Sequence, residues 1–206
     1  MPEEQAIRFD DAGLVPCVAQ DWRSGEVLTV AFMSAESLRL TRETREVHFW
    51  SRSREEIWRK GETSGNVLRL RQLRYDCDAD AVVALVEPTG PACHTGERSC
   101  FHRDLESDER PDPAAHEALA ALERTLEQRQ RELPEGSYTA ELLADPPRIG
   151  EKVREEADEV ARAAAGESDA RVAEEAADVL YHLAVLLRSR DLPLSRVMET
   201  LNERRQ

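Results

Sequence analysis

The pattern of apolar residues changes once along this chain, and this change constrains the fold more than any other feature. Up to about residue 104, short runs rich in β-branched and aromatic residues end in turn residues, which predicts strands. The strand candidates are LVPCVAQD, GEVLTVAFM, REVHFWS, LRLRQLRYD and AVVALVEP, and SAESLRLTRET predicts one helix capped by Ser34. Beyond about residue 115 the spacing is helical almost throughout. We therefore expect an α+β chain of two domains, a β-rich domain followed by an all-α helical bundle.

A charged, proline-containing stretch without periodicity, ESDERPDPAA, separates the two halves. It predicts domains over residues 1–106 and 116–206, joined by a linker over 107–115. The expected helices run over about 114–133, from Ser137, over about 149–165 after a break at Pro146–Pro147, over about 169–190, and from Pro193.

The formal net charge of −14 is shared by both halves and would repel nucleic-acid backbones and anionic membranes. No apolar run reaches the ~18–20 residues needed to span a bilayer, and the acidic N-terminus does not resemble a signal peptide. We therefore expect a cytoplasmic protein that binds neither nucleic acid nor membrane. Since thiols stay reduced in that compartment, the four cysteines are better candidates for metal ligands than for disulfides.

Potential metal ligands concentrate in the segment DCDADAVVALVEPTGPACHTGERSC. If the segment is extended, Asp76, Asp78 and Asp80 fall on one face, where they would repel one another without a cation such as Mg²⁺. Cys77 would then point the other way, toward a second metal or a second subunit. A solvated acidic turn is the alternative. An EF-hand is excluded, because Ala81 replaces the glycine of its loop and no helices flank the segment.

Three cysteines of this segment, Cys77, Cys93 and Cys100, are separated by 16 and then 7 residues, without a CxxC pair. Structural zinc sites usually show two close pairs, so this spacing favours a catalytic zinc with three thiolates and an open position for water. His94 would then serve as general base, or it would complete a closed Cys₃His site, which is the alternative. Cys17 has no ligand neighbour, and we expect it to be a buried apolar residue.

Upstream of this segment, FWSRSREEIWRKGETSGN mixes cationic side chains with hydroxyls and glycines. Guanidinium groups, hydroxyls and the backbone amides at glycines are groups that bind a phosphate monoester. A polar hairpin loop is the alternative interpretation. The candidate substrate-binding residues are Arg52, Arg54, Lys60, Thr63, Ser64, Gly65 and Asn66.

SRSREEIWRKGETSGN, DCDAD and GPACHTGERSCF together resemble the phosphoribosyl-AMP cyclohydrolase family of histidine biosynthesis, over about residues 10–104. The resemblance implies two ligand sets, with Mg²⁺ on Asp76, Asp78 and Asp80 and Zn²⁺ on Cys77, Cys93 and Cys100. It also implies a homodimer whose subunits share the zinc site. The implied reaction is the opening of the adenine ring of phosphoribosyl-AMP by zinc-activated water, which gives the phosphoribosylformimino-aminoimidazole carboxamide ribotide. We expect His94 to carry the proton.

Carboxylates also line two of the predicted helices, beside their apolar stripes. Three of them fall within about 100° of arc in KVREEADEVARAA. In the next helix, Glu175 is followed three residues later by Asp178, and Asp178 is followed four residues later by His182. If the helices pack antiparallel, these groups converge, and a divalent cation makes that tolerable. A solvated surface is the alternative. The carboxylates are Glu155, Glu156, Glu159, Glu175 and Asp178.

The pattern EExxE followed by ExxD, with SYTAELL and EEAADVLYHLAVLL, makes residues 116–206 similar to the phosphoribosyl-ATP pyrophosphohydrolase family. The resemblance implies that the five carboxylates bind Mg²⁺ and that Lys152 pairs with phosphate oxygens. Arg154 and Asp158 depart from the small or apolar residues expected at their positions.

The two families catalyse successive steps, so we expect one bifunctional enzyme. It would release pyrophosphate from phosphoribosyl-ATP and then open the ring of phosphoribosyl-AMP. The alternative is a general nucleoside-triphosphate pyrophosphohydrolase fused to a structural zinc or nucleotide-sensing domain.

Overall fold

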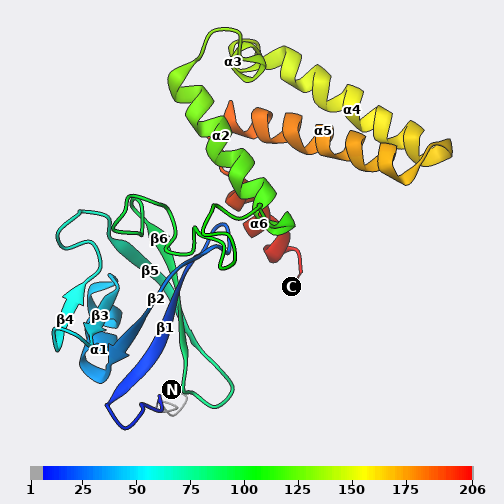
Figure 1. Cartoon of the computed structure of the whole chain (residues 1–206). Helices are drawn as coiled ribbons and strands as arrows, with labels where there is room; N and C mark the ends of the chain where they lie inside the picture. The colour runs from blue at the N-terminus through cyan, green and yellow to red at the C-terminus, as the bar shows by residue number, and fades with distance from the viewer. Residues whose placement is uncertain (1–6, 206) are drawn as a thin grey trace. The chain divides into compact units, whose positions relative to one another are not determined.

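The computed structural model describes residues 7–205, which form two compact units divided between Asp112 and Pro113. The first unit is a β-sheet with one helix, and the second is helical (Figure 1). The expected class, a β-rich domain followed by an all-α one, is confirmed. None of the described helices is long and apolar enough to cross a membrane.

In the described part of the first unit, six strands form one sheet in the order β4-β3-β2-β1-β6-β5. The strands are β1 (Leu14–Asp21), β2 (Val27–Ser34), β3 (His48–Ser51), β4 (Glu56–Arg59), β5 (Leu68–Tyr75) and β6 (Val82–Pro88). Neighbouring strands pair antiparallel, except that β1 and β6 are parallel, with Cys17 opposite Val82.

The centre of the sheet is built on alternation along β1. Val15, Cys17, Ala19 and Asp21 are buried, because side chains two positions apart share a strand face. Burial raises the pKa of the Cys17 thiol to about 12. The thiol is therefore protonated at neutral pH, which confirms the expected apolar role of Cys17.

Helix α1 (Ala35–Thr44) is capped by Ser34, as predicted. The Ser34 hydroxyl accepts from the Ser37 amide (3.2 Å), and the Ser37 hydroxyl accepts from the Ser34 amide (2.8 Å). This reciprocal cap satisfies two amides at the start of the helix. The buried Thr41 hydroxyl accepts from the His48 amide (2.8 Å) and so ties the helix to β3.

Strand β5 departs from the regular alternation of Leu and Arg in its sequence. Leu68 and Leu70 are buried, but the pairing with β6 shifts register between Leu70 and Gln72. An extra residue at a bulge reverses the faces that follow it, so that Leu73 rather than Arg74 turns toward the core.

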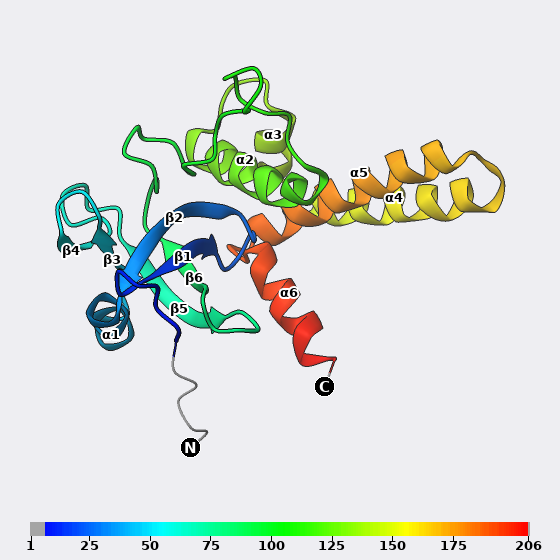
Figure 2. The same cartoon turned by 60° about the horizontal axis from the view of Figure 1, so that its bottom comes forward.

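Five α-helices follow in the described part of the second unit, after one short 3₁₀ turn, η1 (Ala115–Glu117). They are α2 (Ala118–Glu132), α3 (Tyr138–Ala144), α4 (Pro146–Gly166), α5 (Asp169–Arg188) and α6 (Leu194–Glu203). The long helices α4 and α5 run side by side in both views and form a hairpin (Figures 1 and 2).

The prolines of α4 lie inside the helix, whereas we expected the chain to break there and the helix to begin near Ile149. Pro146 and Pro147 occupy its first turn, and the Asp145 carboxylate accepts from the amide of Arg148 (3.5 Å). Amide hydrogens in the first turn of a helix have no acceptor within the helix. Proline, which lacks this hydrogen, therefore fits there.

The second unit has a small core at one end of the α4–α5 hairpin. The core residues are Leu126, Leu142, Ile149, Ala184 and Val185, contributed by α2 to α5. Along the rest of the hairpin the two helices pack mainly on each other, and Leu180 of α5 is exposed.

Candidate active sites

Three aspartates lie in the turn that joins β5 to β6. The segment is not extended as we expected, because Ala79 adopts a left-handed φ of 62°. The Asp76 carboxylate accepts from the amides of Asp80 (3.0 Å) and Ala81 (3.1 Å). The turn gathers Asp76, Asp78 and Asp80, hereafter the aspartate triad, with carboxylate oxygens within 4.8 Å of one another.

The aspartate triad carries mutual repulsion that a cation would relieve. The charge of Asp78, followed by desolvation and the charge of Asp76, raises the pKa of Asp80. Desolvation also acts to raise the pKa of Asp76, but hydrogen bonds from Ala81 and Asp80 outweigh it and lower that pKa. A donor set made of carboxylate oxygens suits a hard ion, so these residues fit Mg²⁺.

The segment from Ala92 to Cys100, hereafter the thiol loop, holds Cys93 in a buried position. The Cys93 amide donates to the carbonyl of Glu97 (3.0 Å), and the Thr95 hydroxyl donates to the Cys93 sulfur (3.1 Å). The Thr95 hydroxyl and then its amide lower the pKa of Cys93. The loop thus favours the thiolate, which is the form that binds metal.

Cys100 lies at the other end of the thiol loop and is exposed. Its amide donates to the carbonyl of Leu28 (2.8 Å), and its sulfur donates to the Thr29 hydroxyl (3.4 Å). Desolvation raises the pKa of Cys100, and the charge of Cys93 raises it further. The two thiols therefore interact, and a cation would allow both to ionise. Paired sulfur donors suit Zn²⁺.

Cys77 lies in the turn of the aspartate triad and is exposed. Over residues 7–205 of a single chain, the side chains gathered closely enough to hold a metal ion are carboxylates, and the cysteines add no further group. A zinc site that joins Cys77 to Cys93 and Cys100 between subunits stays a prediction. His94 is exposed next to this site, with its Nδ1 3.9 Å from the Cys93 sulfur.

Part of the predicted phosphate-binding segment lies against the chain that enters the thiol loop. A Cβ on Gly90 would come within 2.3 Å of the Asn66 Oδ1, and one on Gly61 within 2.4 Å of the Asn66 backbone. The Thr89 hydroxyl donates to the carbonyl of Gly65 (3.3 Å). These close approaches require glycine and place Gly65 and Asn66 beside the entry to the thiol loop.

The cationic residues of the same segment make different contacts. Lys60 lies 5.7 Å from the centre of the Trp58 ring, and its charge acts to lower the pKa of Cys100. Arg52 stacks on Phe32 at 4.1 Å, so its contact is within the sheet. The remaining predicted residues, Arg54, Thr63 and Ser64, are exposed.

The second acidic group joins α4 to α5. Glu156, Glu175 and Asp178, hereafter the helical triad, bring carboxylate oxygens within 4.8 Å of one another, and Glu175 is only 2% exposed. Desolvation raises the pKa of Glu175, as do the charges of Glu159 and Asp178, although Arg171 opposes them. These oxygen donors fit Mg²⁺, and Glu159 is near enough for its charge to act on Glu175.

Glu155 lies apart from the helical triad, on the exposed side of α4. Its carboxylate accepts from Lys152 (2.7 Å), which lowers the pKa of Glu155, and the same ammonium lies 3.5 Å from Glu156. The two departures from the family pattern, Arg154 and Asp158, are also exposed. Neither residue belongs to the triad.

Sequence reasoning placed His182 beside these carboxylates but missed Arg171 and Tyr138, which contact Glu175 and His182. Arg171 forms an ion pair with Glu175, four residues later on the same helix, a spacing that was visible in the sequence. The buried His182 ring is held by Tyr138, whose hydroxyl lies 3.1 Å from Nε2, and by the carbonyl of Asp178, 2.9 Å from Nδ1. The contact with Tyr138 spans 44 residues, so local spacing gave no signal for it.

Each of the two units matches a known protein family. Residues 29–102 match the phosphoribosyl-AMP cyclohydrolase family, and residues 119–205 match the phosphoribosyl-ATP pyrophosphohydrolase family.

Relatives of nearly full length carry the description "histidine biosynthesis bifunctional protein HisIE". The one from Bacillus subtilis is 47% identical over 205 residues, which is 99% of this chain and 97% of the relative. The one from Thermus thermophilus is 47% identical over 97% of this chain and 92% of the relative. The one from Photobacterium profundum is 48% identical over 93% of this chain and 92% of the relative.

Proposed function

The chain belongs to the HisIE family of bifunctional histidine-biosynthesis proteins, and we propose that the metal-ligand groups described above carry its two reactions. It is a phosphoribosyl-ATP pyrophosphohydrolase and a phosphoribosyl-AMP cyclohydrolase. One observation supports the proposal most strongly. Each matched family pattern falls within one compact unit, and each unit gathers its own set of carboxylates or thiols.

In the helical unit, Glu156, Glu175 and Asp178 would hold Mg²⁺, with Glu159 beside them. Mg²⁺ supplies, when bound, a positive charge that neutralises the triphosphate and orients it for attack by water. Lys152 would leave its carboxylate partners to pair with phosphate oxygens. Glu155 would complete the set of ligands after that exchange.

In the sheet unit, Cys93 and Cys100 would hold Zn²⁺, and the aspartate triad would hold Mg²⁺. When bound, zinc would act as a Lewis acid that lowers the pKa of its bound water to near 7. Hydrogen bonds from Thr95 lower the pKa of Cys93 and so favour the thiolate that binds metal. The exposed His94 adjoins this ligand and would carry the proton to the departing ring nitrogen.

The substrate phosphate would bind at the loop that contacts the entry to the thiol loop. Gly65 and Asn66 lie against this entry, and Lys60 acts electrostatically on Cys100. Thr63 and Ser64 expose hydroxyls on the same loop, and Arg52 and Arg54 on the neighbouring hairpin would add charge.

A homodimer would complete the zinc site by bringing Cys77 of one subunit to Cys93 and Cys100 of the other. The exposure of Cys77 and Cys100 supports this arrangement, as does the exposed Phe101 next to the thiol loop. Because ligation requires free thiols, we place the working enzyme in the cytoplasm.

Incubation of the purified protein with phosphoribosyl-ATP, Mg²⁺ and trace Zn²⁺ tests the function. We expect pyrophosphate release, followed by the change in ultraviolet absorbance that accompanies purine opening. In Cys93→Ala and His94→Ala, absorbance should stay constant while pyrophosphate release persists. Ring opening by Cys93→Ala at the wild-type rate would contradict the proposed zinc ligation.

A further inference from the structure

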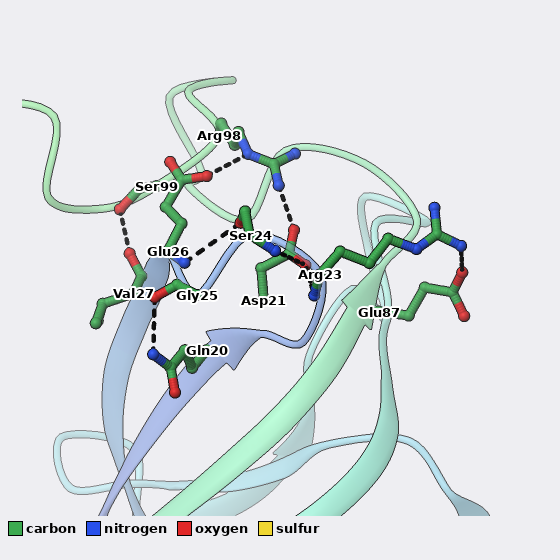
Figure 3. Close-up of polar contacts among 10 residues, drawn as sticks. All are labelled: Gln20, Asp21, Arg23, Ser24, Gly25, Glu26, Val27, Glu87, Arg98 and Ser99. Carbon is green, nitrogen blue, oxygen red and sulfur yellow. Dashed lines mark hydrogen bonds and ion pairs between the residues drawn. The ribbon is translucent and has the colours of Figure 1, made fainter. Parts of the chain in front are cut away.

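An ion-pair network built on one buried carboxylate, that of Asp21, ties the thiol loop to the turn between β1 and β2. Arg98 belongs to the thiol loop, and its guanidinium contacts the carboxylates of Asp21 and Glu26 at once (Figure 3). We call these three residues the arginine clamp. None of them belongs to the ligand sets described above.

The clamp depends on the placement of Asp21 in the sheet. Asp21 continues the buried face of β1 after Val15, Cys17 and Ala19, and it is only 4% exposed. A buried carboxylate requires compensation, which it receives from the Arg23 amide (2.8 Å) and from the guanidinium of Arg98.

The turn that presents both carboxylates is itself well defined. The Asp21 amide donates to the carbonyl of Glu26 (2.8 Å), and the Gly25 amide donates to the carbonyl of Asp21 (2.9 Å). Gly25 has a φ of 77°, and its carbonyl accepts from the Gln20 side chain (2.7 Å) (Figure 3). The carboxylates that Arg98 contacts therefore lie on a turn held by its own hydrogen bonds.

The clamp acts on both thiols because Arg98 stands between them in the loop. Its carbonyl accepts from the amide of Ala92 (3.0 Å), next to Cys93. On its other side, the Ser99 hydroxyl donates to the carbonyl of Val27 (2.7 Å), and Cys100 follows directly. Displacement of Arg98 would therefore move both ends of the loop.

We propose that Arg98, held by Asp21 and Glu26, is a positioning residue that sets the separation of the Cys93 and Cys100 sulfurs for zinc. This inference rests on the proposed zinc ligation by these thiols. A guanidinium fork can contact both carboxylates together, whereas a lysine ammonium acts as a point charge. Zinc affinity should therefore fall in the order wild type, Arg98→Lys, Arg98→Gln.

The test is a competitive zinc titration of the full-length protein against a chromogenic chelator. We expect Arg98→Gln to bind zinc about 10–100-fold more weakly than wild type, in the range measured for residues that orient metal ligands. The absorption bands of the Co²⁺-loaded protein should also shift. Arg110→Gln is the matched control, because it removes an exposed ion pair (2.8 Å) to Glu97 of the same loop. It should leave zinc affinity unchanged.

A separate measurement distinguishes positioning from loss of stability. Trp22, Trp50 and Trp58 all lie in the sheet unit, so tryptophan fluorescence follows the unfolding of that unit alone. Adding Asp21→Asn to Arg98→Gln removes the uncompensated buried charge, and thermal stability should recover. Zinc affinity should stay low, because the loop still lacks its anchor.

Two results would overturn the inference. One is wild-type zinc affinity in Arg98→Gln, and the other is recovery of zinc affinity together with stability in the double variant. If Cys93→Ser binds zinc as tightly as wild type, the zinc ligation itself fails, and the inference fails with it. The cysteine variant therefore shows which of the two proposals is wrong.

Discussion

The aspartate triad and the helical triad each bring three carboxylates within 4.8 Å of one another, but they tolerate the repulsion in different ways. The aspartate triad lies exposed on a turn, where water screens its charges. The helical triad includes two buried carboxylates, and protein cations stand beside it, Arg171 on Glu175 and Lys152 on Glu156. The two buried carboxylates are thus held by direct ion pairs within the protein, whereas the exposed aspartates are open to water and Arg8 acts on Asp80 only through its charge.

The difference should be largest in catalysis, because Glu175 is only 2% exposed and water replaces a buried ligand less readily than an exposed one. We expect Glu175→Gln to slow pyrophosphate release from phosphoribosyl-ATP at least about a hundredfold, because even residues that only orient a ligand cost 10–100-fold. Ring opening of supplied phosphoribosyl-AMP should be unchanged. Coupled pyrophosphate detection and ultraviolet absorbance measure the two reactions on one sample. Equal loss of both activities would show that the units do not act independently.

The exposed triad should respond less strongly. Asp78→Asn removes the charge that contributes most to the raised pKa of Asp80. We expect the Mg²⁺ concentration for half-maximal ring opening to rise about tenfold, the lower end of that range. Excess Mg²⁺ should restore the rate. Glu43→Gln, which neutralises an exposed carboxylate on α1 of the same unit, is the control. A rate that stays low at saturating Mg²⁺ would show that Asp78 does more than bind the ion.

The smallest expected effect is on stability without metal. The pKa of Glu175 is raised from 4.5, so the folded state holds this proton more tightly than the unfolded chain does. Its contribution to stability is therefore present below pH 4.5 and is lost as the pH rises through the raised pKa. In the aspartate triad, the lowered pKa of Asp76 and the raised pKa of Asp80 act in opposite directions.

Thermal unfolding followed by circular dichroism at helical wavelengths tests this pH dependence. Without metal, Glu175→Gln should become more stable than wild type as the pH rises above 4.5, and Mg²⁺ should reverse that order. Glu174→Gln, which alters the exposed neighbour, is the control. A difference between variant and wild type that does not change with pH would contradict the raised pKa.

The elements of this fold were largely predictable from the sequence, because periodicity and capping are local. Ser34 identified the start of α1, and the carboxylates of the helical triad could be recognised from their spacing along two helices. Local rules failed where one residue adopts an unusual conformation, as at Ala79, and where prolines fit a first turn, as at Pro146.

The arginine clamp could not be predicted, because it joins residues 77 positions apart. Asp21 follows Val15, Cys17 and Ala19 at two-residue spacing, which indicates that its carboxylate lies on the buried face of β1 and needs a partner. Which of the many arginines supplies it depends on how β6 returns beside β1, and the spacing of residues does not encode that return.

The parallel pairing of β1 with β6 also has a consequence for synthesis on the ribosome. Strand β1 lies inside the sheet, yet Cys17 and its partner Val82 are 65 positions apart. Contacts of such long range form slowly, and β1 can pair on that side only after β6 has left the exit tunnel. The thiol loop follows β6 directly. We therefore expect the nascent chain to acquire metal late, after most of its first unit has been translated.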